Sequence, residues 1–213
     1  MDVPNPNGVS RHLNALAARG HMRGFRRNVL ILQEGEQGDA LYIVVSGRVR
    51  VFASDSSGRE MTLAVCGPWE YVGEMALDGG YRSANVETLE ATRCAVIPRA
   101  TLLSYIADEP EFALEMLARL IRRARVTTEN ARNIALIDVY GRLTKFLNQL
   151  AGPASNDGSK ALAERITHQA IAGHLACSRE MVSRLLKDLE RGGYIRIDED
   201  RRIVLQKALP SRW

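Results

Sequence analysis

One stretch of this sequence constrains the fold more than any other, because residues 111–140 contain neither glycine nor proline. Asp108 before it is a suitable helix cap, Pro110 suits a first helical turn, and Glu111 completes a capping box. About thirty residues at about 1.5 Å each make a helix of roughly 45 Å, which is longer than a small domain is wide. Such a helix needs a second surface to cover its apolar stripe.

The apolar stripe of this helix advances by alternating steps of four and three residues, which is the a/d pattern of a coiled coil. Its members are Ala113, Leu117, Leu120, Ala124, Thr127, Ala131 and Ile134. Small residues in the second half of the stripe permit close approach of two helices. We therefore predict a homodimer in which the same helix of a second copy covers the stripe about a two-fold axis. The alternative is that the stripe packs on the chain's own N-terminal domain.

The region before the long helix is rich in short β-type runs that turn signals separate. The runs are residues 29–32, 41–45, 48–52, 61–65 and 94–97. Several of them alternate polar and apolar residues, and evenly spaced short strands are typical of an antiparallel barrel or roll. A helix over residues 9–19 is predicted before this roll, and a loose Pro/Asn-rich tail over residues 1–8.

Two short capped helices are predicted between residues 166 and 193. Thr167 is placed to cap the first and Ser178 the second, and Gly192-Gly193 ends the second. The apolar faces of these helices are formed by Ala170, Ile171, Leu175, Met181, Val182, Leu185, Leu186 and Leu189. Two strands follow, over residues 194–197 and 201–205. This succession predicts a winged helix-turn-helix.

The second of these helices carries a polar face suited to reading DNA. Its open side and flanks carry Arg179, Glu180, Ser183, Arg184 and Lys187. Arginine can hold O6 and N7 of guanine together, and glutamate can accept from N4 of cytosine. The wing adds Arg201 and Arg202 as phosphate contacts. The alternative is a solvated face on a plain helical hairpin, which does not explain the two caps, the Gly-Gly stop and the wing.

Residues 177–184, Cys-Ser-Arg-Glu-Met-Val-Ser-Arg, resemble the recognition helix of the cyclic-AMP receptor protein and fumarate-nitrate regulator family, and the likeness covers nearly the whole chain. The resemblance implies that Arg179, Glu180 and Arg184 read TGTGA-type half-sites of a palindromic duplex. It implies phosphate contacts at Thr167 and Ser178, and a weaker one at His168, which departs from the family's usual basic residue. The loop at residues 153–160 corresponds to the place where relatives contact RNA polymerase.

Residues 71–84 resemble the phosphate-binding cassette of cyclic-nucleotide domains. Arg82 offers paired donors to phosphate oxygens, and Ser83 and nearby backbone N–H groups add more. Glu74 is suited to accept from a ribose 2′-hydroxyl, and Gly73 lets the backbone approach the sugar. The predicted ligand-binding residues in this segment are Gly73, Glu74, Met75, Arg82, Ser83 and Ala84. The alternative is that Glu74 and Arg82 pair with each other across a surface turn.

The resemblance also bears on which nucleotide binds. Thr127 and Thr128 match positions where the central helices of both subunits contact adenine, and Arg123 matches a basic position one turn earlier. This points to cyclic AMP as the allosteric effector. The eight-residue step from Glu74 to Arg82 is shorter than in many relatives, so cyclic di-GMP, cyclic GMP, or DNA binding without any effector stay open as alternatives.

Composition bounds the remaining classes. The 3 cysteines, Cys66, Cys94 and Cys177, form no CxxC and no cluster for iron–sulfur or haem binding, and the histidines form no metal set, so we expect no metal and no cofactor. A rival reading, an enzyme acting on cyclic nucleotides, lacks a metal site and a nucleophile–base pair. A pure interaction module does not account for the recognition helix. Reduced cysteines and no signal or membrane-spanning pattern predict a cytoplasmic protein.

The predicted fold class is therefore α+β with three parts. Residues 1–108 form a cyclic-nucleotide-binding antiparallel β-roll with an N-terminal helix. Residues 109–138 form the central dimerisation helix, and residues 139–213 the C-terminal winged helix-turn-helix that binds DNA. The net charge of +4 suits an anionic partner but decides little alone.

Overall fold

The computed structural model describes residues 10–56, 58–155 and 158–210, so the predicted tail at residues 1–8 lies outside the described part. The chain divides into two units, Met1–Ala53 with Thr62–Arg125 and Ser54–Met61 with Val126–Trp213. The division falls inside α3 (Pro110–Leu136), which supplies residues to both units. Each unit has its own hydrophobic core.

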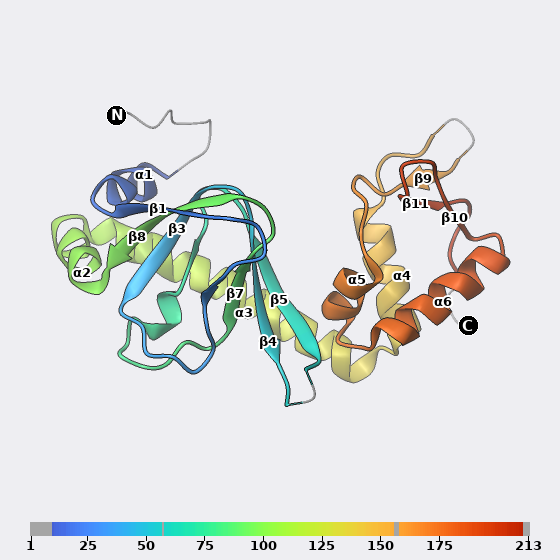
Figure 1. Ribbon diagram of the computed structural model, residues 1–213, viewed down its shortest axis with the longest axis horizontal. Helices are drawn as coiled ribbons and strands as arrows, with labels where there is room; N and C mark the ends of the chain where they lie inside the picture. The colour runs from blue at the N-terminus through green and yellow to red at the C-terminus, as the bar shows by residue number, and fades with distance from the viewer. Residues whose placement is uncertain (1–9, 57, 156–157, 211–213) are drawn as a thin grey trace. The chain divides into compact units, whose positions relative to one another are not determined.

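The first unit contains a roll of two four-stranded antiparallel sheets, as the spacing of the β-type runs predicts (Figure 1). The strand orders are β1-β8-β3-β6 and β2-β7-β4-β5. The strands are β1 (His21–Phe25), β2 (Leu30–Leu32), β3 (Ala40–Ser46), β4 (Val49–Ser54), β5 (Glu60–Cys66), β6 (Tyr71–Val72), β7 (Asn85–Thr88) and β8 (Thr92–Pro98). Sequence patterning missed β1, β6 and β7, because β6 is only two residues long and the other two lack a clear apolar alternation.

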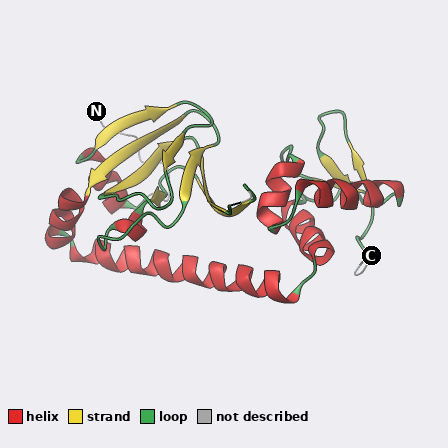
Figure 2. Ribbon diagram, turned by 60° about the horizontal axis from the view of Figure 1, so that its bottom comes forward, coloured by secondary structure: helices red, strands yellow, loops and turns green. Residues whose placement is uncertain are grey.

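Three helices pack on this roll. α1 (Arg11–Ala18) is capped by Ser10, and α2 (Arg99–Asp108) lies with it at one end of the roll (Figure 1). The first half of α3 runs alongside the roll (Figure 2), and it buries Phe112 and Met116. These two side chains join residues from β3, β6 and β8 in one core.

The start of α3 differs from the prediction. Asp108 is the last residue of α2, a helix that the sequence pattern did not predict, and its carboxylate forms an ion pair with Arg19 at 3.2 Å. The N–H of Glu109 still bonds to the carbonyl of Tyr105, so the chain closes one helix immediately before Pro110 opens the next. Asp108 is therefore not the cap of the long helix.

The end of α3 also lies earlier than predicted. The helix stops at Leu136, and Asp138 caps α4 (Val139–Leu150) by accepting from the N–H of Gly141 at 2.7 Å. Gly141 thus lies in the first turn of α4, and the carboxylate of Asp138 caps the start of that helix.

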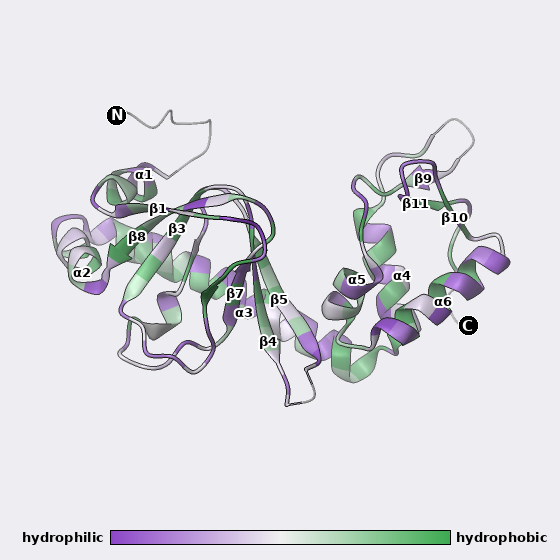
Figure 3. Cartoon of the chain, viewed as in Figure 1, coloured by the Kyte–Doolittle hydropathy of each residue, from purple (hydrophilic) through white to green (hydrophobic). Residues whose placement is uncertain are grey.

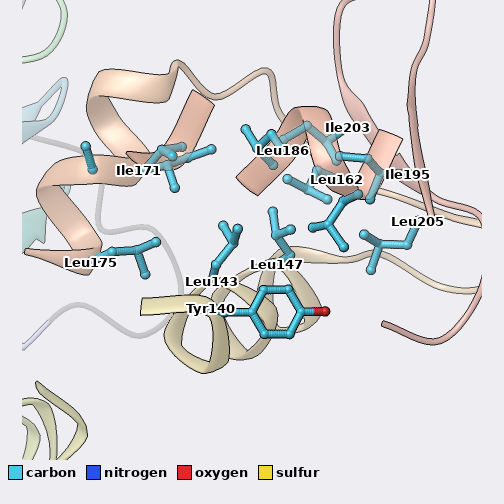
Figure 4. Close-up of a cluster of buried hydrophobic side chains, with 13 residues drawn as sticks. Tyr140, Leu143, Leu147, Leu162, Ile171, Leu175, Leu186, Ile195, Ile203 and Leu205 are labelled. Atoms are coloured by element: carbon cyan, nitrogen blue, oxygen red, sulfur yellow. The ribbon is translucent and has the colours of Figure 1, made fainter. Parts of the chain in front are cut away.

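The second unit contains α4, α5 (His168–Leu175), α6 (Arg179–Arg191) and a small sheet of order β10-β11-β9. Its strands are β9 (Lys160–Ala161), β10 (Ile195–Ile197) and β11 (Ile203–Leu205). Side chains of α4 point toward apolar residues of α5, α6 and the sheet (Figure 4). Both predicted caps are confirmed, because Thr167 accepts from the N–H of Ala170 and Ser178 from that of Met181.

Candidate functional site

Arg82 is buried in the predicted ligand segment, with 7% of its surface exposed. Its Nη1 donates to the carbonyl of Gly73 at 2.7 Å, and its Nη2 to the carbonyl of Ala40 at 3.0 Å. Within the described ranges no carboxylate pairs with this guanidinium. A buried cation without a counter-ion is unfavourable, so the position favours an anionic ligand.

Two glycines make room for that side chain. A Cβ on Gly38 would lie 2.1 Å from Nε of Arg82, and one on Gly73 would lie 2.6 Å from its Nη1. Gly73 also has a φ of +89°, a backbone conformation that other residues rarely adopt. Gly38 was not singled out from the sequence, because the contact joins residues 44 positions apart.

The rest of the cassette is a tight turn. Residues Glu74–Ala76 form a single 3-10 turn, η1, and the N–H of Arg82 donates to the carbonyl of Glu36 at 2.8 Å. Met75 is 61% exposed, and its sulfur lies 3.4 Å from Oγ of Ser83. Ala84 is buried immediately before β7. The ligand-binding residues predicted between positions 73 and 84 therefore lie in one loop, together with the buried Arg82.

Glu74 is held by α3 and not by Arg82. Nη1 of Arg123 donates to Oε1 of Glu74 in a short ion pair, and Nη2 donates to the carbonyl of Tyr71 at 2.7 Å. Burial works to lower the pKa of Arg123, but the Glu74 carboxylate outweighs it and the pKa is raised. The alternative of a Glu74–Arg82 pair is wrong, because each side chain has other partners.

Thr127 and Thr128 follow Arg123 by one turn on α3, and both are exposed. They lie beyond the division of the chain, and their role toward a nucleotide stays a prediction. The predicted dimer stripe is also exposed at Leu117 (53%) and Ile134 (41%). In the first half of α3, the residues buried against the roll are Phe112 and Met116, which are not members of the stripe.

The polar face of α6 is open to solvent. A shallow hollow on it is lined by Arg179, Glu180, Ser183, Arg184 and Lys187. Among the described residues, the three cations of this set have no ion pair or hydrogen bond. The opposite face buries Val182, Leu186 and Leu189, so α6 has a hydrophilic and a hydrophobic side (Figure 3). The recognition residues predicted from the sequence are thus together and unobstructed.

His168 joins the two helices of this motif. Its Nδ1 lies 2.8 Å from Oγ of Ser183, which links the first residue of α5 to the middle of α6. The neighbouring caps, Thr167 and Ser178, are both exposed and keep a hydroxyl hydrogen for a further acceptor. These positions surround the start of α6.

The wing presents one arginine and restrains the other. Arg202 pairs with Asp198 at 3.0 Å and Asp200 at 2.8 Å, and its backbone N–H, followed by its guanidinium, holds the pKa of Asp198 below its usual range. Arg201 lies at the turn with a φ of +60°, is exposed, and has no ion pair in the described part of the chain. Arg201 is therefore the wing cation available to an anion.

Sequence reasoning missed Arg142. Its Nη2 and Nε donate to the carbonyl of Leu175 at 3.0 and 3.2 Å, and its Nη1 donates to the carbonyl of Ile137 at 2.6 Å. This side chain joins the break after α3 to the C-terminal end of α5. No sequence signal marks it, because its acceptors are backbone carbonyls.

The described residues contain no group of three or more His, Cys, Asp or Glu side chains that could hold a metal ion. In that same part of the chain, no helix has the length and apolar character needed to cross a membrane.

Residues 22–109 match the cyclic nucleotide-binding domain family, and residues 141–208 match the Crp-like helix-turn-helix domain family. The chain is 36% identical over 177 residues to the CRP-like cAMP-activated global transcriptional regulator of Mycobacterium tuberculosis, covering 82% of this chain and 79% of that protein. It is 33% identical over 173 residues to the cAMP-activated global transcriptional regulator CRP of Escherichia coli, covering 80% and 82%. The chain belongs to the CRP/FNR family of transcription regulators.

Among solved structures, the c-di-GMP-responsive global regulator CLP of Xanthomonas campestris is 27% identical, with a TM-score of 0.81 over 92% of this chain and 98% of that one. This CRP/FNR-family chain is a DNA-binding transcription regulator that responds to a cyclic nucleotide, and not an enzyme. The winged helix-turn-helix and the β-roll predicted from the sequence are confirmed.

Proposed function

We propose that the protein is a homodimer whose affinity for a palindromic TGTGA-type DNA site rises when each subunit binds cyclic AMP. The observation that carries the effector half is the buried Arg82, which has two backbone acceptors and, in the described chain, no carboxylate. A phosphodiester supplies the missing negative charge, and a guanidinium suits its paired oxygens.

Glu74 would accept from the ribose 2′-hydroxyl, while Gly73 admits the sugar to the backbone and Ser83 donates to the phosphate. Because Glu74 already pairs with Arg123, the ligand has to share or replace that ion pair, which connects ligand binding to α3. Thr127 and Thr128 then provide polar contacts for the adenine base. The matched relatives named as cAMP-activated favour cyclic AMP.

Cyclic di-GMP is the second candidate, and a specific observation favours it. Arg82 follows Glu74 by only eight positions, and the structural neighbour CLP is named as c-di-GMP-responsive. Met75 and Tyr81, in the same loop, are 61% and 64% exposed, and their side chains would offer apolar surface to the two bases of cyclic di-GMP.

The dimer rests on the exposed stripe of α3. Leu117, Leu120 and Ile134 repeat at coiled-coil spacing and are all exposed in the single chain. Burying such side chains against a second copy is favourable by about 25 cal/mol per Å² of apolar surface. The two recognition helices would then meet half-sites about 34 Å apart, one turn of DNA.

On DNA, Arg179, Glu180 and Arg184 would contact base edges. Ser183, on the same face of α6, would also contact the DNA. Phosphate contacts would come from Thr167, His168, Ser178, Lys187 and Arg201. The effector acts by binding the DNA-competent arrangement more tightly than the other, with the segment 137–141 as the place where the helix changes. The protein would contact RNA polymerase through residues 153–160 and would be located in the cytoplasm.

The test is fluorescence anisotropy of a labelled TGTGA-N6-TCACA duplex at fixed salt, titrated with protein alone, with cyclic AMP and with cyclic di-GMP. Salt is fixed because phosphate contacts make the affinity depend on it. We expect cyclic AMP to tighten binding about tenfold or more, a coupling of about 1.4 kcal/mol. Specific binding that neither nucleotide changes would refute the effector half and leave the DNA half intact.

A further inference from the structure

The segment that leads into the cassette is a strained turn. Trp69 has a φ of +64°, a left-handed conformation that is a genuine outlier for a bulky side chain. Such a conformation persists only where surrounding contacts over-determine it. Two residues later the chain enters β6, and Glu74 comes two residues after β6 ends. The position of this turn therefore bears on where Glu74 lies.

One side of the turn is fixed to β3. The N–H of Trp69 donates to the carbonyl of Val44 at 2.6 Å, and the N–H of Val44 donates to the carbonyl of Glu70 at 2.8 Å. The other side is fixed by α3 through Arg119. Its Nη2 lies 3.2 Å from Oε1 of Glu70, and its guanidinium lies 4.7 Å from the ring centroid of Tyr71.

Arg119 also reaches the strained residue itself. Its Nη1 and Nη2 lie 3.4 and 3.5 Å from the carbonyl oxygen of Trp69, as a long two-pronged contact. The second oxygen of Glu70 accepts from the N–H of Gly67 at 2.8 Å, so the carboxylate bridges the start of the turn and α3. Arg119 thus meets three successive residues, 69–71, with its side chain 19% exposed.

Arg119 and Arg123 lie four residues apart on one face of α3, and both guanidiniums lie over the ring of Tyr71. Arg123 contacts Glu74 inside the cassette, whereas Arg119 contacts residues 69–71, where the chain enters it. The two arginines therefore hold successive parts of residues 69–74 against the same helix.

We propose that Arg119 is a positioning residue for effector binding: it fixes the strained turn at Trp69 and so sets β6 and Glu74 against α3. The proposal rests on the cyclic-nucleotide site proposed above. An ion pair of this exposure contributes little to stability, because solvent screens it, so the main effect of Arg119 is on the geometry of the cassette.

The test uses the full-length protein with Trp213→Phe, which leaves Trp69 as the sole tryptophan of the two in the chain. In this background, Arg119→Gln is compared with Arg122→Gln, an exposed neighbour on the same helix that loses the same charge. Trp69 emission is recorded without ligand, and cyclic AMP binding is measured by calorimetry well below the melting temperature. Arg119→Lys keeps the charge for Glu70 but not the planar group.

Arg119→Gln is expected to shift Trp69 emission to the red and to weaken cyclic AMP binding about tenfold, or 1.4 kcal/mol. Arg122→Gln is expected to change neither, and Arg119→Lys to fall between. Unchanged emission in Arg119→Gln overturns the proposal, as does shifted emission with unchanged cyclic AMP affinity. If the starting protein binds no cyclic AMP, that effector assignment fails by itself, and the same comparison with cyclic di-GMP as the probe decides the role of Arg119.

Discussion

The cassette of the roll and the polar face of α6 hold their charges in opposite ways. In the cassette, Arg82 is buried against carbonyls and Glu74 is paired with Arg123. On α6, Arg179 and Arg184 are exposed, and neither has an ion pair in the described part of the chain. In the proposed function, an effector would therefore have to replace or share internal contacts in the cassette, whereas the polar face of α6 would not have to break any ion pair to meet DNA.

The largest expected effect comes from removing the buried cation. Arg82→Ala should weaken effector binding by about a hundredfold or more, since two charge-assisted hydrogen bonds of about 1.5 kcal/mol each are lost. Gly38→Ala should have a similar effect with every charge kept, because its Cβ would displace the guanidinium. Calorimetric titration with cyclic AMP measures both.

Gly24→Ala is the matched control, because a Cβ there meets nothing within 4 Å. If Gly38→Ala bound the effector as tightly as Gly24→Ala does, the ligand would not depend on the buried position of Arg82. The contrast between the two regions would then be mistaken.

The second effect is on DNA recognition. Arg179→Ala should cost about 1–3 kcal/mol on the TGTGA-type duplex and relax preference at one base pair. Lys187→Ala should weaken binding to all duplexes and reduce the slope of log affinity against log salt by about one. Anisotropy titrations at several salt concentrations, on specific and scrambled duplexes, separate the two. Equal losses on both duplexes for Arg179→Ala would assign it to phosphate.

A smaller effect tests whether the α6 face is preformed. Ser178→Ala should lower the free energy of unfolding of the second unit by about 1 kcal/mol, because the cap for the N–H of Met181 is lost. Ser178→Asp keeps a capping oxygen, so thermal unfolding should be close to the original, while DNA binding falls by phosphate repulsion. Parallel losses of stability and affinity in Ser178→Asp would argue against a separate phosphate contact.

The smallest effect concerns alkaline pH. Burial raises the pKa of Cys66 and of Cys94 from 9.0 to about 11, so both thiols stay neutral in the folded roll. The stability from this difference is complete below pH 9.0 and is lost as the pH rises through about 11, because the unfolded thiols ionise first. Urea unfolding across that range should show a falling free energy of unfolding.

The control is the same titration with both thiols replaced, in Cys66→Ala with Cys94→Ala. The variant is less stable throughout, but its free energy of unfolding should fall less steeply with pH. An equal slope in the two proteins would place the alkaline sensitivity elsewhere.

The two units also differ in how far the sequence predicts them. In the helix-turn-helix, Thr167 and Ser178 act on N–H groups three residues away, so local spacing was sufficient. In the roll, Arg82 donates to backbone carbonyls, one of them 42 positions away at Ala40, and no residue type marks a carbonyl. The predicted ends of the long helix were wrong because Asp108 has a competing partner in Arg19 and Asp138 caps the next helix.

Position 38 offers a way to sort relatives of this protein. A chain that carries any side chain there has no space for an arginine seated as Arg82 is, whatever the rest of its cassette looks like. One residue outside the cassette of residues 71–84 would thus indicate whether an arginine can be held in the position of Arg82. Family members that have arginine and serine at the positions of Arg82 and Ser83, but no glycine at the position of Gly38, should hold the phosphate of their ligand in another way. Alternatively, they should no longer respond to a cyclic nucleotide.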